Sequence, residues 1–288
     1  MEKGLRYGEA ISSLVRRRIF EGLDAWLRSL DLLERSRRVQ RMVDLAIGGI
    51  EVEPMPRCLN AAHRAILVSN YPSVSQTLRA VLKVGCRLPG AEFRLKGIGR
   101  PEVVTHASSL LKALGIANLV FPVHKDEAGA FRLHRKVVKE VLAFLDGPGH
   151  VLWMSITGRT RGNGLLEGDL RSGAALFCLT KGVPLVPMGL VTREQEGRLR
   201  VVKVRFGEPI NPPEVGEMGD FEKSDFLIDF SKLALCQTAK LLPPGQRGDF
   251  ENFEEKLEET ERRLRMHQLG DCRRNTLVSG SKGLRGEP

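Results

Sequence analysis

The stretch AILVSNYPSVSQ at residues 65–76 decides the fold. Its first four residues form a short apolar run, a polar turn follows, and residues 77–84 have the spacing of a helix. A buried strand that passes through a turn into a helix is the repeating unit of α/β proteins. Their ligands bind beyond the carboxyl ends of the strands, where this turn lies. No side chain from Ser69 to Gln76 accepts a proton at neutral pH, so the turn by itself does not prove a reaction site.

The same alternation of apolar runs and helical patterns continues from residue 64 onward. Strands are predicted at 64–69, 118–123, 150–155, 184–190 and 200–206, and helices at 74–84, 102–114, 127–145, 171–181 and 222–241. Strands that alternate with helices favour a largely parallel sheet, and right-handed crossovers place the helices on both of its faces. We therefore expect an α/β domain with its sheet flanked by helices.

Both ends of the chain differ from this central part in their pattern. Residues 10–33 show helical periodicity with several arginines, and 36–47 predict a second basic helix. The first helix either lies on an anionic membrane with Trp26 at the interface, or packs on the domain with its arginines solvated. We expect an N-terminal basic amphipathic helical region at 1–49, the α/β domain at 50–245, and a charged helix with a disordered tail after Gly270 at 246–288.

Composition limits the compartment and the partners. The formal net charge of +10 favours anionic partners, and with only 6% aromatic residues we place lipid and phosphorylated substrates before nucleic acid, which is not expected. No apolar run is long enough to cross a bilayer, and the N-terminus does not resemble a secretory signal. Five scattered cysteines are typical of reduced thiols. We expect a cytoplasmic protein, peripheral on the inner face of a membrane, that uses no metal or other cofactor.

Four segments of the sequence, the first of which lies within the stretch quoted above, occur in a distinctive order. They are SNYPSVSQ at 69–76, GIANLVFPVHKD at 115–126, WMSITGRTRGNG at 153–164 with VPLVPM at 183–188, and VRFGEPI at 204–210. In this order and spacing they resemble the glycerolipid acyltransferases of the lysophosphatidate acyltransferase superfamily over roughly residues 50–210. The resemblance implies transfer of an acyl group from a thioester of CoA or acyl carrier protein to a lysophospholipid or glycerol phosphate.

The departures from the family pattern fall on the catalytic positions. That family carries an N-H-x-S-x-x-x-D-like block, in which His is the general base and Asp orients it. Here the His position is Tyr71 and the Asp position is Gln76, whereas Asn70 and Ser73 match. The family's Glu before Gly is replaced by Thr157. A tyrosine has an ordinary pKa of about 10 and an amide carries no charge, so both changes remove base strength.

Other histidines were considered as a replacement base. His63 and His150 precede their predicted strands, so both lie at the wrong end of the sheet. His124 follows its predicted strand and is either a replacement base or a solvated loop residue. Trp153 and Phe177 are predicted core residues and are not assigned to an acyl-chain site, and Cys178 is predicted to be a buried residue without a nucleophilic role.

The anion-binding positions of the family are better kept than the catalytic ones. By resemblance, His124, Lys125, Thr157, Gly158, Arg159 and Arg161 join Asn70 and Ser73 as substrate-binding residues. Arginine binds phosphate through two donors at once, and glycine lets backbone N–H groups approach an anion. The alternative is a basic glycine-rich surface loop without a ligand.

Two functions remain from the sequence. One is an acyltransferase-like enzyme with an altered catalytic motif at Tyr71 and Gln76, which depends on positioning of its substrates. The other is a catalytically inactive homologue that binds lipid, acyl carrier or a partner protein. A nucleic-acid binder has only the net charge in its favour.

Overall fold

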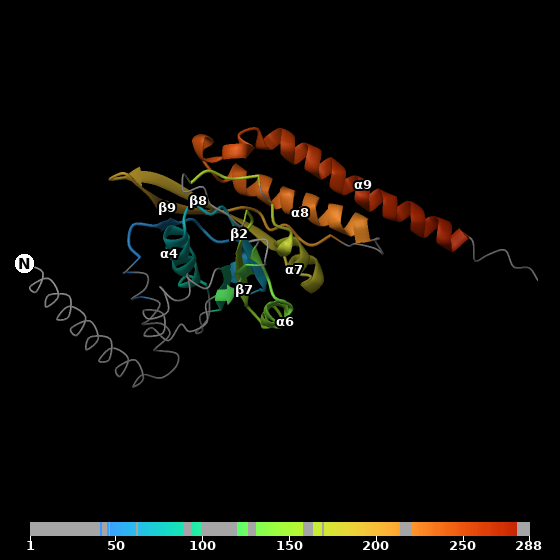
Figure 1. The fold of residues 1–288 in the computed structure, drawn as a ribbon, viewed down its shortest axis with the longest axis horizontal. Coiled ribbons are helices and arrows are strands. Elements are labelled where there is room, and N and C mark those ends of the chain that lie inside the picture. The colour runs from blue at the N-terminus through green and yellow to red at the C-terminus, as the bar shows by residue number, and fades with distance from the viewer. Residues whose placement is uncertain are drawn as a thin grey trace, which may run out of the picture.

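The fold is a twisted seven-stranded sheet with helices on both faces (Figure 1). The computed structural model describes residues 41, 45, 47–61, 63–88, 94–99, 120–125, 131–157, 164–168, 170–213 and 220–280. The strands, in spatial order, are β1 (Glu51–Val52), β9 (Arg198–Phe206), β8 (Leu185–Gln195), β2 (Ala65–Ser69), β7 (Val151–Ser155), β3 (Leu95–Gly99) and β4 (Val120–Pro122). All neighbours are parallel except β8 and β9, which form an antiparallel hairpin. The expectation of a largely parallel α/β sheet is confirmed.

Strand β2 is the centre of this sheet. It pairs with β7 on one side, where Ala65 is opposite Val151, and with β8 on the other, where Ile66 is opposite Leu185. All five residues of β2 are buried. A parallel strand that is covered on both faces reads as a continuous apolar run, which explains the sequence AILV.

Two apolar cores lie on the two faces of the sheet, because successive side chains of a strand point to opposite sides. Leu67 and Trp153 belong to the core beneath α4 (Val74–Gly85), whereas Val68 and Met154 belong to the core on the other face. That second face is covered by α6 (Arg135–Phe144), α7 (Gly173–Lys181) and α8 (Asp220–Lys240). The short helix α3 (Arg57–Asn60) comes before β2 in the chain. The carboxyl end of β2 therefore lies between two well-packed layers.

Two antiparallel helices complete the described part of the chain. The 3-10 turns η1 (Pro244–Gln246) and η2 (Gly248–Phe250) lead from α8 into α9 (Phe253–Gly280), which lies along α8 and runs past its end (Figure 1). The packing is supported by an ion pair of Lys232 with Glu259, at 3.8 Å, and by a hydrogen bond between Nε2 of His267 and Oδ2 of Asp229, at 3.2 Å. Helix α9 continues past Gly270 to Gly280, so the prediction of disorder after Gly270 is wrong for this part of the backbone. One glycine lowers the stability of a helix by only about 1 kcal/mol.

Several other element boundaries differ from the predicted ones. Strand β3 was not predicted, and the helix predicted at 127–145 begins only at Arg135, since β5 (His124–Lys125) and β6 (Phe131–Arg132) form a small antiparallel ribbon before it. The helix predicted at 102–114 and those of the N-terminal region, apart from isolated residues, lie outside the described residues. Within the described part of the chain, no helix is long and apolar enough to cross a bilayer.

Candidate functional site

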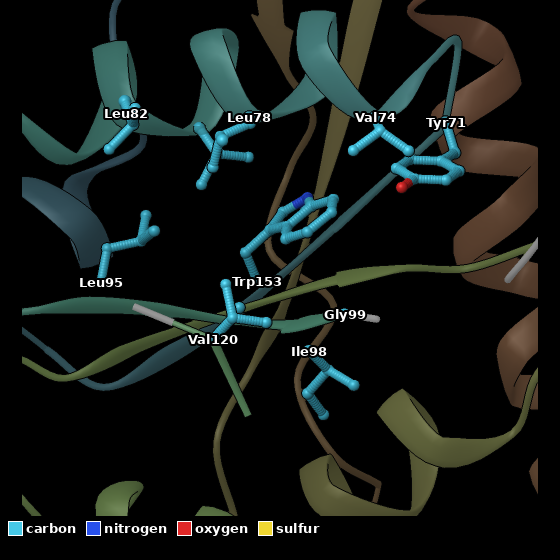
Figure 2. Close-up of a pocket in the computed structure, with 11 residues that line it drawn as sticks. Tyr71, Val74, Leu78, Leu82, Leu95, Ile98, Gly99, Val120 and Trp153 are labelled. Atoms are coloured by element: carbon cyan, nitrogen blue, oxygen red, sulfur yellow. The ribbon is translucent and has the colours of Figure 1, made fainter. Parts of the chain in front are cut away.

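An apolar cavity lies between α4 and the strands β3, β4 and β7, beside the carboxyl end of β2 (Figure 2). Its empty volume, including the part open to solvent, is about 460 Å³. Helix α4 provides one wall, the indole of Trp153 provides another, and Tyr71 stands at one end with its phenolic oxygen directed toward the cavity. Its lining consists of Tyr71, Val74, Leu78, Val81, Leu82, Leu95, Gly97, Ile98, Gly99, Val120 and Trp153.

The two glycines of β3 create the space for this cavity. A Cβ at Gly97 would lie 2.7 Å from Cε3 of Trp153, and a Cβ at Gly99 would lie 3.1 Å from Cγ1 of Val120. Glycine in a strand provides no side chain to pack and often marks a place of close approach. The two glycines thus make the strand LKGIG less stable, and their missing side chains leave space beneath α4.

The indole of Trp153 is held in place by a hydrogen bond. Its Nε1–H donates to Oγ of Ser69 at 2.9 Å, and the Ser69 hydroxyl in turn donates to the carbonyl of Asn70 at 2.9 Å. The ring centroids of Trp153 and Tyr71 are 6.3 Å apart, with an angle of 38° between the planes. Trp153 is a buried core residue, as predicted, and it is also a wall of the cavity, which was not predicted.

A wider cleft adjoins the apolar cavity and shares Tyr71, Ile98, Gly99 and Trp153 with it. Its empty volume is about 1010 Å³ on the same measure. The other lining residues are Val123, Leu133, Met154, Ser155, Arg171, Ser172 and Gly173. Arg171 and Ser172 immediately precede α7, so a cation and the positive end of a helix dipole lie at this cleft. An apolar cavity and a wider, largely apolar cleft that contains one arginine and two serines therefore meet at Tyr71.

Asn70, predicted to bind substrate, has its side chain bonded to the neighbouring strand. Its Nδ2–H donates to the carbonyl of Leu190 at 3.0 Å, and its Oδ1 accepts from the Leu190 N–H at 2.8 Å. The residue is 1% exposed. The amide thus continues the pairing between β2 and β8 after the backbone of β2 has turned away, which is a structural role.

Ser73 and Gln76 have structural partners as well. Ser73 is the N-cap of α4, and its Oγ accepts from the backbone N–H of Gln76 at 3.3 Å. The Gln76 Oε1 accepts from the backbone N–H of Val201 at 3.1 Å, which ties α4 to β9. Tyr71 lines both cavities and Gln76 lines neither. Of the two predicted catalytic positions, only Tyr71 therefore borders the cavities.

The remaining predicted residues lie around the wide cleft or outside the described chain. Thr157 is buried, with Oγ1 3.4 Å from Oγ of Ser155, a lining residue. His124 is exposed and lies in β5 with Lys125, next to the lining residue Val123. Gly158, Arg159 and Arg161 are outside the described residues.

Two groups considered for catalysis take no part in the site. His150 lies before β7, with Nδ1 2.6 Å from the Phe144 carbonyl and its ring stacked on that of Phe144. Burial raises the pKa of the Cys178 thiol to about 12, so the thiolate is scarcely populated at neutral pH. The predictions that His150 lies at the far end of its strand and that Cys178 is buried are confirmed. Among the described residues no cluster of three metal-binding side chains occurs.

Sequence reasoning missed Gly97, Gly99, Arg171 and the lining role of Trp153. Two glycines that alternate in LKGIG were a signal for an opened strand face, and an arginine just before a predicted helix was a signal for an anion site. Comparison of the chain with models of known families, with curated proteins and with solved structures finds no match in any of the three. No known relative therefore assigns a chemistry to this site, and its geometry alone describes it.

Proposed function

We propose that this chain is an acyltransferase-like protein that binds an acyl lipid. The supporting observation is the apolar cavity beneath α4, which adjoins at Tyr71 a wider cleft that contains Arg171. In this proposal the end of an acyl chain lies against the apolar cavity, and a phosphate or thioester-bearing head lies in the wider cleft near Arg171. By the resemblance in its sequence, the ligands are the acyl thioester of CoA or acyl carrier protein and a lysophospholipid or glycerol phosphate. The protein acts in the cytoplasm, at the inner face of a membrane.

The arrangement of the polar groups favours binding without acyl transfer. A general base needs a pKa near the operating pH and a partner that stabilises its charged form. The side chain at position 71 is a phenol, which as a residue type has a pKa of about 10. The amide of Gln76 is uncharged and is bonded to Val201. The function that we propose first is therefore that of a catalytically inactive homologue, which holds an acyl lipid or presents it to a partner.

A second candidate function is slow acyl transfer, and the position of Tyr71 favours it. This residue lines both cavities, so its phenol lies where an acceptor hydroxyl and an acyl chain meet. Loss of a general base costs about 10²–10⁴-fold in rate. Positioning of two substrates contributes about 7–11 kcal/mol to lowering a barrier, so measurable transfer can remain.

Binding to the cavity is tested with a fluorescent dodecanoic acid and with lysophosphatidate as its competitor. Gly99→Leu fills the cavity beside Val120 and is expected to raise the Kd at least tenfold. The control is Ala143→Leu, on the exposed face of α6, which adds three of the same four carbon atoms outside the cavity. Circular dichroism shows whether both variants remain folded. Equal affinity of the folded Gly99→Leu variant and the wild type would reject the cavity as the lipid site.

Transfer is tested with labelled acyl-CoA or acyl carrier protein and with glycerol phosphate or lysophosphatidate as acceptors. A chain that binds lipid but transfers nothing supports the inactive homologue. Transfer that falls at least 100-fold in Tyr71→Phe supports a role of the phenol, whereas transfer that survives this change shows that the phenol is not the base. A variant with Tyr71→His, Gln76→Asp and Thr157→Glu tests whether the family's dyad restores activity.

A further inference from the structure

A second feature of the molecule, the outer face of α6, has no role in the site described so far. Its buried side is apolar, with Val137, Val141 and Leu145 in the core. Arg135, Lys136, Lys139, Glu140 and Ala143 are exposed and share one arc of the helix. No ion pair joins the first three of these to a carboxylate anywhere in the described ranges.

The charges at the start of α6 oppose helix stability. The first turn holds no acidic residue, and it places Arg135 and Lys136 at the end where the helix dipole is already positive. Acidic residues are the stabilising choice at this position. The N-cap is His134, whose Nδ1 accepts from the Lys136 N–H at 3.3 Å. Because folding does not favour these cations here, they are better explained by an anionic partner.

The cationic face continues onto the neighbouring ribbon and reaches the cleft. In the ribbon of β5 and β6, His124 is the register partner of Arg132, and both are exposed. We call His124, Arg132, His134, Arg135, Lys136 and Lys139 the α6 basic surface. Val123 and Leu133, which adjoin this surface along the chain, line the wide cleft. The start of the α6 basic surface is therefore next in the chain to two residues that line the wide cleft.

We propose that the α6 basic surface docks an acidic acyl carrier protein that delivers its acyl chain to the cleft. This inference rests on the proposed function, and it names the carrier for the same site. Charge complementarity selects an acidic partner, and a carrier docked here needs only a flexible arm to reach the cleft. None of the strongly exposed large apolar side chains of the described residues lies on this surface, so it lacks the apolar groups that insert into a bilayer.

The experiment measures the Kd of fluorescently labelled dodecanoyl-acyl carrier protein for the full chain. In Lys136→Glu/Lys139→Glu, the Kd is expected to rise at least tenfold and to lose most of its dependence on salt. The matched control is Arg262→Glu/Arg265→Glu on the exposed face of α9, which changes the net charge equally. For this control the Kd is expected to change less than twofold. Equal losses in the two double variants would show a general charge effect and overturn the proposal.

Two further experiments distinguish binding at the α6 basic surface from binding at the proposed lipid site and from binding to a membrane. Dodecanoic acid must bind Lys136→Glu/Lys139→Glu as tightly as the wild type, which shows that the lipid site is intact. If that acid binds the wild type but the carrier binds neither protein, the docking proposal fails and the proposed function stands. If the carrier binds and no acyl ligand enters the cavity, the proposed function fails. Loss of binding to phosphatidylglycerol vesicles, with carrier binding unchanged, would make the surface a membrane contact and overturn the proposal.

Discussion

One hydroxyl group, that of Ser69, connects the core of the sheet to the candidate site. It lies at the last position of β2, accepts from the indole of Trp153 and donates to the carbonyl of Asn70. Ser69 and Trp153 are both buried, and a buried polar group that lacks a hydrogen-bond partner destabilises the folded state. The wall of the apolar cavity therefore depends on a residue that does not line it.

Replacement of Ser69 tests this dependence. Ser69→Ala leaves the Trp153 N–H without its acceptor and is expected to lower the free energy of unfolding by about 1–3 kcal/mol, measured by urea denaturation. In a Trp153→Phe background the indole N–H is absent, so the same change is expected to cost at least about 1 kcal/mol less. An equal cost in both backgrounds would mean that the hydrogen bond contributes nothing to stability.

At the scale of the elements, helix α4 begins at a turn whose side chains fix its position. The resemblance of the sequence to the acyltransferases assigns these same side chains to the reaction site. Ser73 caps its first turn, and Gln76 ties that turn to β9 through the N–H of Val201. The helix is amphipathic and covers the apolar cavity with Val74, Leu78 and Leu82. The position of α4 thus sets the width of the cavity, and the polar residues of the turn serve that positioning.

The cap of α4 can be measured by itself. Ser73→Ala removes the acceptor of the Gln76 N–H and is expected to lower the free energy of unfolding by about 1 kcal/mol. Ser73→Asp keeps an acceptor and is expected to retain most of the stability. Ser75→Ala, two residues further on at an exposed position, serves as the control and is expected to be close to neutral. Equal losses for Ser73→Ala and Ser75→Ala would disprove the capping role.

The predictable elements were those whose pattern is local. The apolar runs of β2, β7 and β8 predicted strands, and all three are present. Strand β3 was missed because LKGIG contains two glycines and a lysine, which are typical of a loop. The roles of Asn70 and Gln76 were beyond prediction, since their partners Leu190 and Val201 are 120 and 125 residues away in the chain. Local sequence located the turn, whereas only the sheet order revealed what its side chains contact.

At the scale of the whole molecule, the polar and apolar parts of the proposed lipid site come from many segments. The cleft collects residues from β3, β7, the turn after β2, the two positions that flank the ribbon and the start of α7. These segments meet only when the sheet is complete, so binding of an acyl lipid also reports on global folding. Conditions that unfold the sheet are therefore expected to abolish binding, and its stability must be known before binding data are interpreted.

High pH provides such a condition through the two cysteines buried beneath the sheet. Burial raises the pKa of Cys178 to about 12 and that of Cys236 to about 11, from an ordinary value of 9.0. Above pH 9 these thiols ionise in the unfolded chain and stay protonated in the folded one, so their contribution to stability is present below pH 9 and is lost as the pH rises toward 11–12.

We therefore expect the free energy of unfolding to fall more steeply between pH 8 and 10.5 in the wild type than in Cys178→Ala. The difference between the two slopes is expected to be on the order of 1–3 kcal/mol over this interval, because one pKa unit corresponds to about 1.4 kcal/mol. Urea denaturation at both pH values measures it, and the variant controls for the tyrosines and lysines that titrate in the same range. Parallel pH profiles would show that the Cys178 thiol ionises equally in the folded and unfolded chain, and would contradict the raised pKa.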